Sequence, residues 1–234
     1  MSTEKLQSNL KYSFSNEAFL NEALTHRSFL NENPQWKIPN NERLEFLGDA
    51  VLELAVTEEL FNRYPDKEEG WMTSVRAALV NYVMLADVAR AVGLEKFILL
   101  SRGELKDTGR ARDVILANAL ESVIGALYLD GAYPAAKKFI NDAVLSHLDE
   151  VLKKSLYMDA KSSLQEKVQA TLKLTPVYKV ISSEGPDHKK TFTIGVYFGD
   201  KLIAQGTGPS KQDGEVDAAK KALEKFESER KPIL

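Results

Sequence analysis

Acidic residues in the segment NERLEFLGDAVLEL, residues 41–54, have the spacing that lines up carboxylates on one side of a helix. The apolar residues recur at helical intervals and predict a face turned toward a core; they are Leu44, Leu47, Val51 and Leu54. At about 100° per residue, the acidic residues fall within roughly 80° of one another on the opposite side; they are Glu42, Glu45, Asp49 and Glu53. Like charges four residues apart destabilise a helix by roughly 0.2–0.5 kcal/mol per pair, and the segment has no Lys or Arg at those intervals. The sequence therefore predicts a stripe of unpaired carboxylates.

A second segment, VILANALESVIGALYLD at residues 114–130, is apolar nearly all round and predicts a buried helix. Its few polar positions include Asn118 and Glu121, which share one narrow line with Gly125. An unpaired carboxylate is costly to bury, so we expect Glu121 to have a partner. One interpretation is a structural salt bridge to a neighbouring Arg. The other is that Glu121 faces the acidic stripe with a divalent cation between the two helices.

A cation at such a site would be a hard one, because Mg²⁺ takes oxygen ligands from carboxylates and substrate phosphates. The chain has no cysteine, and none of its three histidines follows a Glu by three residues, as a ferritin-like di-iron bundle requires. These features favour Mg²⁺, with Mn²⁺ as a substitute. No Ser/His/Asp or Cys/His arrangement competes, and GTGPSK at residues 206–211 lacks the residue order of a nucleotide-binding P-loop.

Phe46 lies beside the carboxylates on the same helical wheel, away from the apolar face. Another helix of the same domain would ordinarily cover such a side chain. The alternative is that Phe46 docks into a partner chain.

Helices must position these residues. Apolar periodicity predicts helical segments at 16–30, 41–64, 72–92, 112–130 and 134–154, and no strand pattern precedes about residue 175. The polar stretch KKSLYMDAKSS, residues 153–163, then predicts a short linker.

The pattern changes after this linker. A short helix, with Leu164, Val168 and Leu172 on one face, precedes three β-rich runs, of which the last two meet in a hairpin turn at Gly199 and Asp200. The closing helix carries an apolar stripe formed by Val216, Ala219, Leu223 and Phe226. The second part is therefore expected to be α-β-β-β-α, a small sheet with helices on one face.

The composition suits a protein of two small domains with different partners. The chain has 234 residues and no run of 18 apolar residues, so a membrane span is not expected. The start lacks the features of a signal peptide, and with the absence of cysteine this favours a cytoplasmic setting. Residues 1–155 hold 18 Lys/Arg and 23 Asp/Glu, a net charge of −5, whereas residues 156–234 hold 13 and 11, a net charge of +2.

NERLEFLGDAVL resembles the signature of the ribonuclease III family, and the match extends across EALTHRSFLNE, VRAALVN, GLEKFILLSRGE and GRARDVILANALESVIGALYLDGAY. The second part resembles a double-stranded-RNA-binding domain through LQEKVQA, PVYKV, GPDHKKTF and GTGPSKQDGEVDAAKKAL. The resemblance implies an all-α nuclease domain at 1–155 followed by a small α+β binding domain at 158–229. It implies a homodimeric, Mg²⁺-dependent endoribonuclease, without a small-molecule cofactor, that processes structured RNA precursors such as those of rRNA and mRNA. The products would be 5′-phosphates and 3′-hydroxyls with short 3′ overhangs.

The resemblance also assigns roles by position. Glu45, Asp49 and Glu121 match the family's metal-binding carboxylates, and Asp49 and Glu121 would also orient the attacking water. Asn118 stands where the family usually has a metal-binding Asp, and we expect its amide oxygen to ligate in its place. Glu42 and Glu69 match acidic positions near the scissile phosphate, and Phe46 matches an aromatic knob that enters the other subunit. Asn40 stands where a His is common.

In the second domain, Gln165, Glu166 and His188 resemble the family's readers of the RNA minor groove. Lys211 lies at a helix start suited to a phosphate, next to Gln212, where the family has a second Lys. Gly214 and Asp217 replace two customary alanines. The implied enzyme has two alternatives, a catalytically silent RNA-binding protein and a structural dimer with a vestigial acidic site. The retained Glu45, Asp49 and Glu121 argue against both.

Overall fold

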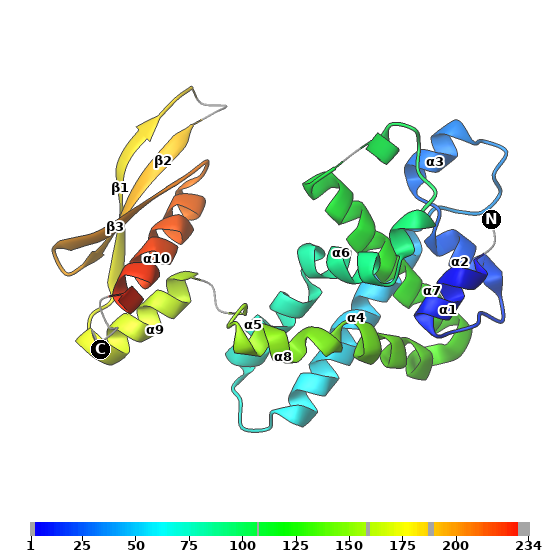
Figure 1. Cartoon of the computed structure of the whole chain (residues 1–234), viewed down its shortest axis with the longest axis horizontal. Helices are drawn as coiled ribbons and strands as arrows, with labels where there is room; N and C mark the ends of the chain where they lie inside the picture. The colour runs from blue at the N-terminus through cyan, green and yellow to red at the C-terminus, as the bar shows by residue number, and fades with distance from the viewer. Residues whose placement is uncertain (1–2, 107, 158–159, 187–189, 229–234) are drawn as a thin grey trace. The chain divides into compact units, whose positions relative to one another are not determined.

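The structure, a computed structural model, describes residues 3–106, 108–157, 160–186 and 190–228. The chain divides into two compact units, Met1–Tyr157 and Met158–Leu234 (Figure 1). Each unit is considered by itself below.

The first unit is helical, as the sequence predicts. Its helices are α1 (Glu4–Leu10), α2 (Glu17–Ala23), α3 (Arg27–Glu32), α4 (Glu42–Arg63), α5 (Glu69–Val80), α6 (Tyr82–Ala91), α7 (Arg110–Ala143) and α8 (Leu148–Lys153). Short 3₁₀ turns lie at Leu94–Lys96, Glu104–Lys106 and Leu145–His147, and an isolated parallel bridge joins Thr25 to Leu99. Helix α1 lies outside the helical segments that the sequence predicts.

Two predicted helices are interrupted because polar side chains cap a new helix within them. The segment 16–30 divides where the His26 side chain accepts the backbone N–H of Ser28 at the start of α3. The segment 72–92 divides at Asn81, whose side-chain oxygen accepts the N–H groups of Val83 and Met84 at 3.1 and 3.0 Å.

The predicted break between 130 and 134 is present inside α7, where Gly131 and Ala132 leave the helical conformation. Asp130 fastens the N-terminal segment to this kink. Its carboxylate accepts the Tyr12 hydroxyl at 2.8 Å and the N–H groups of Ser15 and Asn16, each at 2.9 Å.

Helices α4 and α7 form the centre of the first unit and make the most extensive contact among its described elements. A Cβ added at Gly48 would lie 1.7 Å from the carbonyl oxygen of Glu121, and one at Gly125 would lie 2.3 Å from that of Leu44. The two backbones therefore touch at this crossing, and only glycine permits it at either position. Large apolar side chains surround the crossing with less than 2% exposure; they include Leu52, Leu116, Leu120 and Ile124.

The buried face of α4 differs from the predicted one. Leu44 and Val51 are buried, but Leu47 is only partly buried and Leu54 is 56% exposed. Gly48, Leu52, Ala55 and Val56 complete the buried face instead. The face is rotated because α7 packs against the glycine side of α4.

A contact beyond the kink holds α4 near its other end. Glu58 of α4 accepts a hydrogen bond from the Tyr133 hydroxyl and pairs with the Lys137 ammonium at 2.9 Å. Both residues belong to the part of α7 that follows Ala132. Helix α7 thus contacts α4 on both sides of the kink.

The stretch Arg110–Lys153 is long and apolar enough to cross a membrane, judged by length and composition only. However, 56% of its most apolar 18-residue segment is buried inside the first unit. The core around Leu116, Leu120 and Ile124 accounts for this apolar character.

The second unit has the predicted order, with α9 (Ala160–Leu172), β1 (Pro176–Glu184), β2 (Thr191–Phe198), β3 (Lys201–Gly208) and α10 (Lys211–Ser228). Its antiparallel sheet has the strand order β1-β2-β3, and Phe198 pairs with Lys201 across the predicted turn, where Gly199 has a φ of 60°. The core lies between β2 and the two helices; it contains Leu164, Val168, Val196, Phe198, Ala218, Ala219 and Ala222. Leu172 is 46% exposed rather than buried, because it is the last residue of α9.

We predict that Gly48→Ala lowers the free energy of unfolding by roughly 1–3 kcal/mol or more, because the new methyl group forces α4 away from α7. Gly70→Ala is the matched control, since Gly70 lies in α5 and a Cβ added there would meet no atom within 4 Å. That change should raise stability by up to about 1 kcal/mol. Urea unfolding followed by circular dichroism measures both, and equal effects at the two positions would contradict the close helix crossing.

Candidate active site

The start of α4 is fixed against α7 by a buried hydrogen-bond network. The backbone N–H of Asn41 donates to the carbonyl of Thr25 at 2.9 Å. The buried Ser122 hydroxyl lies 3.2 Å from the carbonyl oxygen of Asn41 and 2.7 Å from that of Asn118. The Asn40 side chain accepts the N–H of Glu42 at 3.3 Å, which satisfies one backbone donor in the first turn of α4. This network sets the first turn of α4 opposite the Asn118 turn of α7.

Glu121 lies partly buried at the helix crossing and faces other carboxylates. Burial, followed by the negative charges of Asp49 and Glu45, raises the pKa of Glu121 to about 8. None of the ion pairs recorded for the described residues involves Glu121. The structure therefore does not support the structural salt bridge that was one interpretation of this residue.

Glu45 responds to the same surroundings. Its pKa is raised by burial and by the charge of Glu42, lowered by a hydrogen bond from the Asn118 side chain, and raised again by Asp49. A carboxylate at position 118 would add charge where this amide relieves it. Asn118 therefore favours the ionised form of Glu45, where a carboxylate would repel it, and still provides an oxygen atom at the site.

The acidic stripe is only partly unpaired, which corrects the prediction from sequence. Glu53 pairs with Arg76 of α5 at 2.8 Å, and Glu42 pairs with Arg27 of α3 at 3.5 Å. These cations come from other helices, so spacing within α4 does not reveal them. Glu45 and Asp49 have no ion pair recorded in the described part of the chain.

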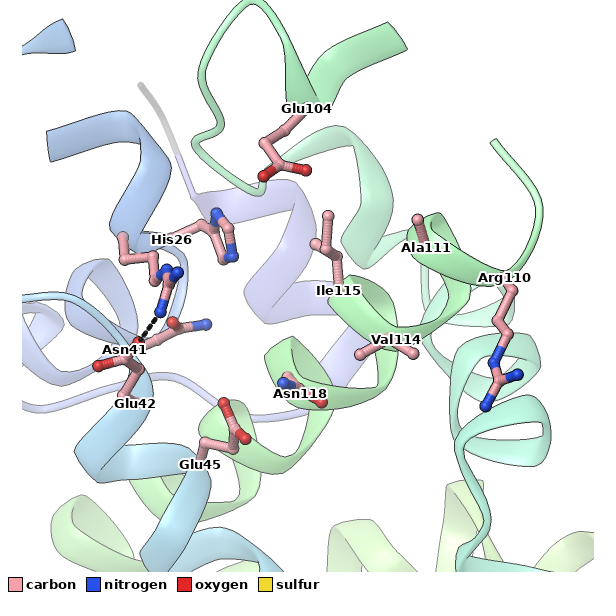
Figure 2. A pocket seen from close by; sticks show the side chains of 11 residues that line it. His26, Asn41, Glu42, Glu45, Glu104, Arg110, Ala111, Val114, Ile115 and Asn118 are labelled. Carbon is pink, nitrogen blue, oxygen red and sulfur yellow. Dashed lines mark hydrogen bonds and ion pairs between the residues drawn. The ribbon is translucent and has the colours of Figure 1, made fainter. Parts of the chain in front are cut away.

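A cavity of about 770 Å³ opens beside Glu45 and Asn118 (Figure 2). Its lining comes from the starts of α3, α4 and α7 and from a 3₁₀ turn; it comprises His26, Arg27, Asn41, Glu42, Glu45, Glu104, Arg110, Ala111, Val114, Ile115 and Asn118. No role for His26 is predicted from the sequence. The pKa of His26 is lowered by burial and by the charge of Arg27, against a smaller opposing effect of Glu42. Asp49 and Glu121 lie outside this lining.

The predicted ligands share one oxygen-rich region but do not form a finished metal site. No group of three or more His, Cys, Asp or Glu side chains in the described ranges has the geometry to hold a metal ion. The chemistry of the donors still fits a hard divalent cation, because Glu121 faces Asp49 and Glu45 without a neutralising side chain. A cation would have to draw these carboxylates closer together.

The structure separates Glu69 from the other acidic residues. Glu69 is the exposed first residue of α5 and accepts a hydrogen bond from Thr73 at 2.9 Å. Helix α4 has 22 residues, a length of about 33 Å. Since α5 begins after α4 ends, Glu69 lies toward the opposite end of α4 from Glu42 and Glu45.

Phe46 is 82% exposed, so no helix of its own domain covers it. Leu54 and Phe61 are also exposed, at 56% and 67%, and fall within about 80° of Phe46 around the α4 axis. The three side chains form an apolar ridge, here called the α4 ridge. An exposed apolar surface of this kind is typical of a protein interface.

The second unit brings two of the predicted RNA-binding residues together. Gln165 of α9 and Gln212 of α10 line one cavity of about 470 Å³. Glu166 and Lys211 are exposed on the same two helices. His188 lies outside the described residues.

The start of α10 is more acidic than the phosphate-site prediction assumed. Asp213 accepts the Ser210 hydroxyl at 2.6 Å and donates its N–H to the same oxygen at 3.1 Å. Asp217 accepts the N–H of Thr207 at 2.8 Å, which fastens α10 to β3, and a Cβ on Gly214 would lie 2.6 Å from Ile194. Gly214 therefore allows α10 to pack closely on β2, and Asp217 has a hydrogen-bonding role.

Comparison with known proteins relates both units to one family. Residues 16–148 match the family described as Ribonuclease-III-like, and residues 160–226 match the Double-stranded RNA binding motif. Ribonuclease 3 of Carboxydothermus hydrogenoformans is 44% identical over 98% of this chain and 97% of its own. Ribonuclease 3 of Borreliella burgdorferi is 42% identical over 96% of this chain and 91% of its own. A solved nuclease domain of ribonuclease III from Campylobacter jejuni, described for flexibility in a region involved in dimer formation, covers 62% of this chain and 97% of its own, with 41% identity and a TM-score of 0.56.

We predict that the metal-free protein loses stability relative to Glu121→Gln as the pH rises from 5 to 8. The folded state keeps a proton on Glu121 up to about pH 8, whereas the unfolded chain releases it near 4.5. The stabilising contribution is therefore complete below pH 4.5 and is lost as the pH approaches 8, with a slope of up to about 1.4 kcal/mol per pH unit. Thermal unfolding of both proteins in EDTA measures this, and parallel pH curves would contradict it.

Proposed function

The chain belongs to the ribonuclease III family, and we propose that it cuts double-stranded RNA with a divalent metal ion held by Glu45, Asp49, Asn118 and Glu121. It is an endoribonuclease with a double-stranded-RNA-binding domain. The observation that carries the metal proposal is the group of carboxylates around Glu121, whose mutual repulsion contributes, with burial, to raising the pKa of Glu121 to about 8. A divalent cation offsets that repulsion.

The chain's own residues would position the reactants. Mg²⁺ or Mn²⁺, when bound, would supply an activated water and neutralise charge that develops on the phosphate. Asp49 and Glu121 orient the attacking water by accepting its protons in hydrogen bonds, while Glu45 and Asn118 complete the ligand set. Glu42 lines the cavity together with Glu45 and Asn118, and it would lie near the scissile phosphate. The expected products are 5′-phosphate and 3′-hydroxyl ends.

We further propose a homodimer built on the α4 ridge. A two-fold interface uses the same patch twice, and Phe46 is adjacent to Glu45 in sequence. Two sites held in fixed relation would cut both strands and leave short 3′ overhangs. A role for Glu69 at the scissile phosphate then requires the partner subunit, because Glu69 and Glu42 lie toward opposite ends of α4 in one protomer.

The second domain would hold the duplex through Gln165, Glu166, Lys211 and Gln212, and the role of His188 stays a prediction from the sequence. We propose cytoplasmic processing of rRNA and mRNA precursors as the setting. This proposal is supported by the family assignment and by the absence of cysteine from the chain.

The proposed chemistry is tested with long duplex RNA and Mg²⁺. We expect the wild type to yield short duplexes with 5′-phosphates, and Glu121→Gln to bind the duplex normally but to cut it at least about 100-fold more slowly, since the neutral side chain loses its ligand charge. Glu59→Gln, a carboxylate elsewhere on α4, is the control and should cut normally. Cleavage by Glu121→Gln at the wild-type rate would refute the metal assignment. Binding without cleavage by the wild type would favour the silent RNA-binding protein.

We predict that Phe46→Ala weakens the dimer by at least about 2 kcal/mol, roughly 30-fold in the dimer dissociation constant. Because Phe46 is 82% exposed in the protomer, the unfolding of the monomer should change little. Leu172→Ala, an exposed apolar residue of the second unit, is the control. Analytical ultracentrifugation reads the dimer constant, and an unchanged value would remove Phe46 from the interface.

A further inference from the structure

Arg110 lines the same cavity as Glu45 and Asn118, yet the proposed reaction gives it no role. It is the first residue of α7, and Val114 and Asn118 follow it at four-residue intervals on one side of the helix. Figure 2 shows Val114 between Arg110 and Asn118 along the cavity wall. The wall thus passes from a cation, over an apolar side chain, to the predicted metal ligands.

The Arg110 guanidinium is oriented without being neutralised. It lies over the ring of Tyr82, the first residue of α6, at 5.6 Å from the ring centroid. None of the ion pairs recorded within the described residues involves Arg110, whereas Arg27, which lines the same cavity, pairs with Glu42. A cation–π contact directs a guanidinium and leaves its charge available to an anion.

The stability of α7 does not account for Arg110. The positive end of a helix dipole disfavours a cation in the first turn. The preceding residue, Gly109, provides no side-chain cap. Arg110 opposes the preference of a helix start for negative charge and is exposed beside the cavity. Binding therefore explains this residue better than folding does.

We propose that Arg110, oriented by Tyr82, binds a backbone phosphate of the RNA strand that is being cut. This inference rests on the proposed function. Arg110 and Asn118 are eight positions apart on α7, a rise of about 12 Å. The phosphate is therefore a neighbour of the scissile phosphate along the strand, not the scissile phosphate itself. The fork of the guanidinium suits two phosphate oxygens, and Val114 lies against the intervening sugar.

The test uses the full-length protein and a duplex RNA, with affinity measured in Ca²⁺ at several salt concentrations and single-turnover cleavage measured in Mg²⁺. We expect Arg110→Ala to weaken binding roughly 5- to 10-fold and to reduce the slope of log affinity against log salt by about 1, the loss of one phosphate contact. Arg110→Lys should recover part of the affinity. Arg63→Ala is the matched control, because Arg63 also lies over a tyrosine ring, at 5.8 Å, but pairs with Asp149 away from the cavity.

Tyr82 provides an independent readout of positioning. Tyr82→Leu should weaken binding in the wild type but have no further effect in the Arg110→Ala background, whereas Tyr82→Phe keeps the ring and should bind normally. Equal affinity and salt slope for Arg110→Ala and Arg63→Ala would overturn the proposal. So would additive effects of Tyr82→Leu and Arg110→Ala. Failure of the wild type to cut duplex RNA would instead overturn the proposed function, and the affinity measurements would still decide the role of Arg110.

Discussion

The contact between the backbones of α4 and α7 is the constraint on which the rest of the first unit depends. Gly48 lies against the backbone carbonyl of Glu121, and Gly125 lies against that of Leu44. The two helices therefore cannot move apart without opening the core. Glu45 precedes Gly48 by three residues and Asp49 follows it directly, and the acidic residue nearest to Gly48 on α7 is Glu121. The crossing that closes the apolar core is therefore the same crossing that gathers the carboxylates. Packing energy from Leu52, Leu120 and their neighbours holds like charges together against their repulsion.

This arrangement places the repulsion between carboxylates at the α4–α7 crossing, where the packing of the fold is tightest. The burial and charges that raise the pKa of Glu121 oppose its ionised form, which is the form that the proposed metal site requires. Asn118 moderates the cost by donating to Glu45. In the proposed metal site, one negative charge fewer would reduce the repulsion that opposes folding and would also weaken the attraction for a cation.

The sequence predicted what periodic patterns and short motifs encode. Helical spacing located α4 and the first part of α7, and alternation located β2 with its hairpin turn at Gly199. The pairing of Glu53 with Arg76 was missed because it joins residues of two different helices. The spacing of Leu54 wrongly predicts a core position, because exposed and buried apolar residues look alike in sequence. The role of Arg110 is not visible in the sequence because its contact with Tyr82 links α7 to α6. The contact between Asp213 and Ser210 at the start of α10 depends on side-chain geometry, so the sequence does not reveal it either.

The kink at Gly131 and Ala132 has a mechanical consequence for α4. Before the kink, α7 holds α4 through the glycine crossing, and after it Tyr133 and Lys137 hold Glu58. Contacts at two separated places along α4 oppose its rotation about the helix axis. Rolling would otherwise exchange the directions of consecutive side chains, which differ by about 100°. The bend in α7 thus fixes the rotational orientation of α4 about its own axis. Glu45 therefore keeps facing inward and Phe46 keeps facing outward under thermal motion.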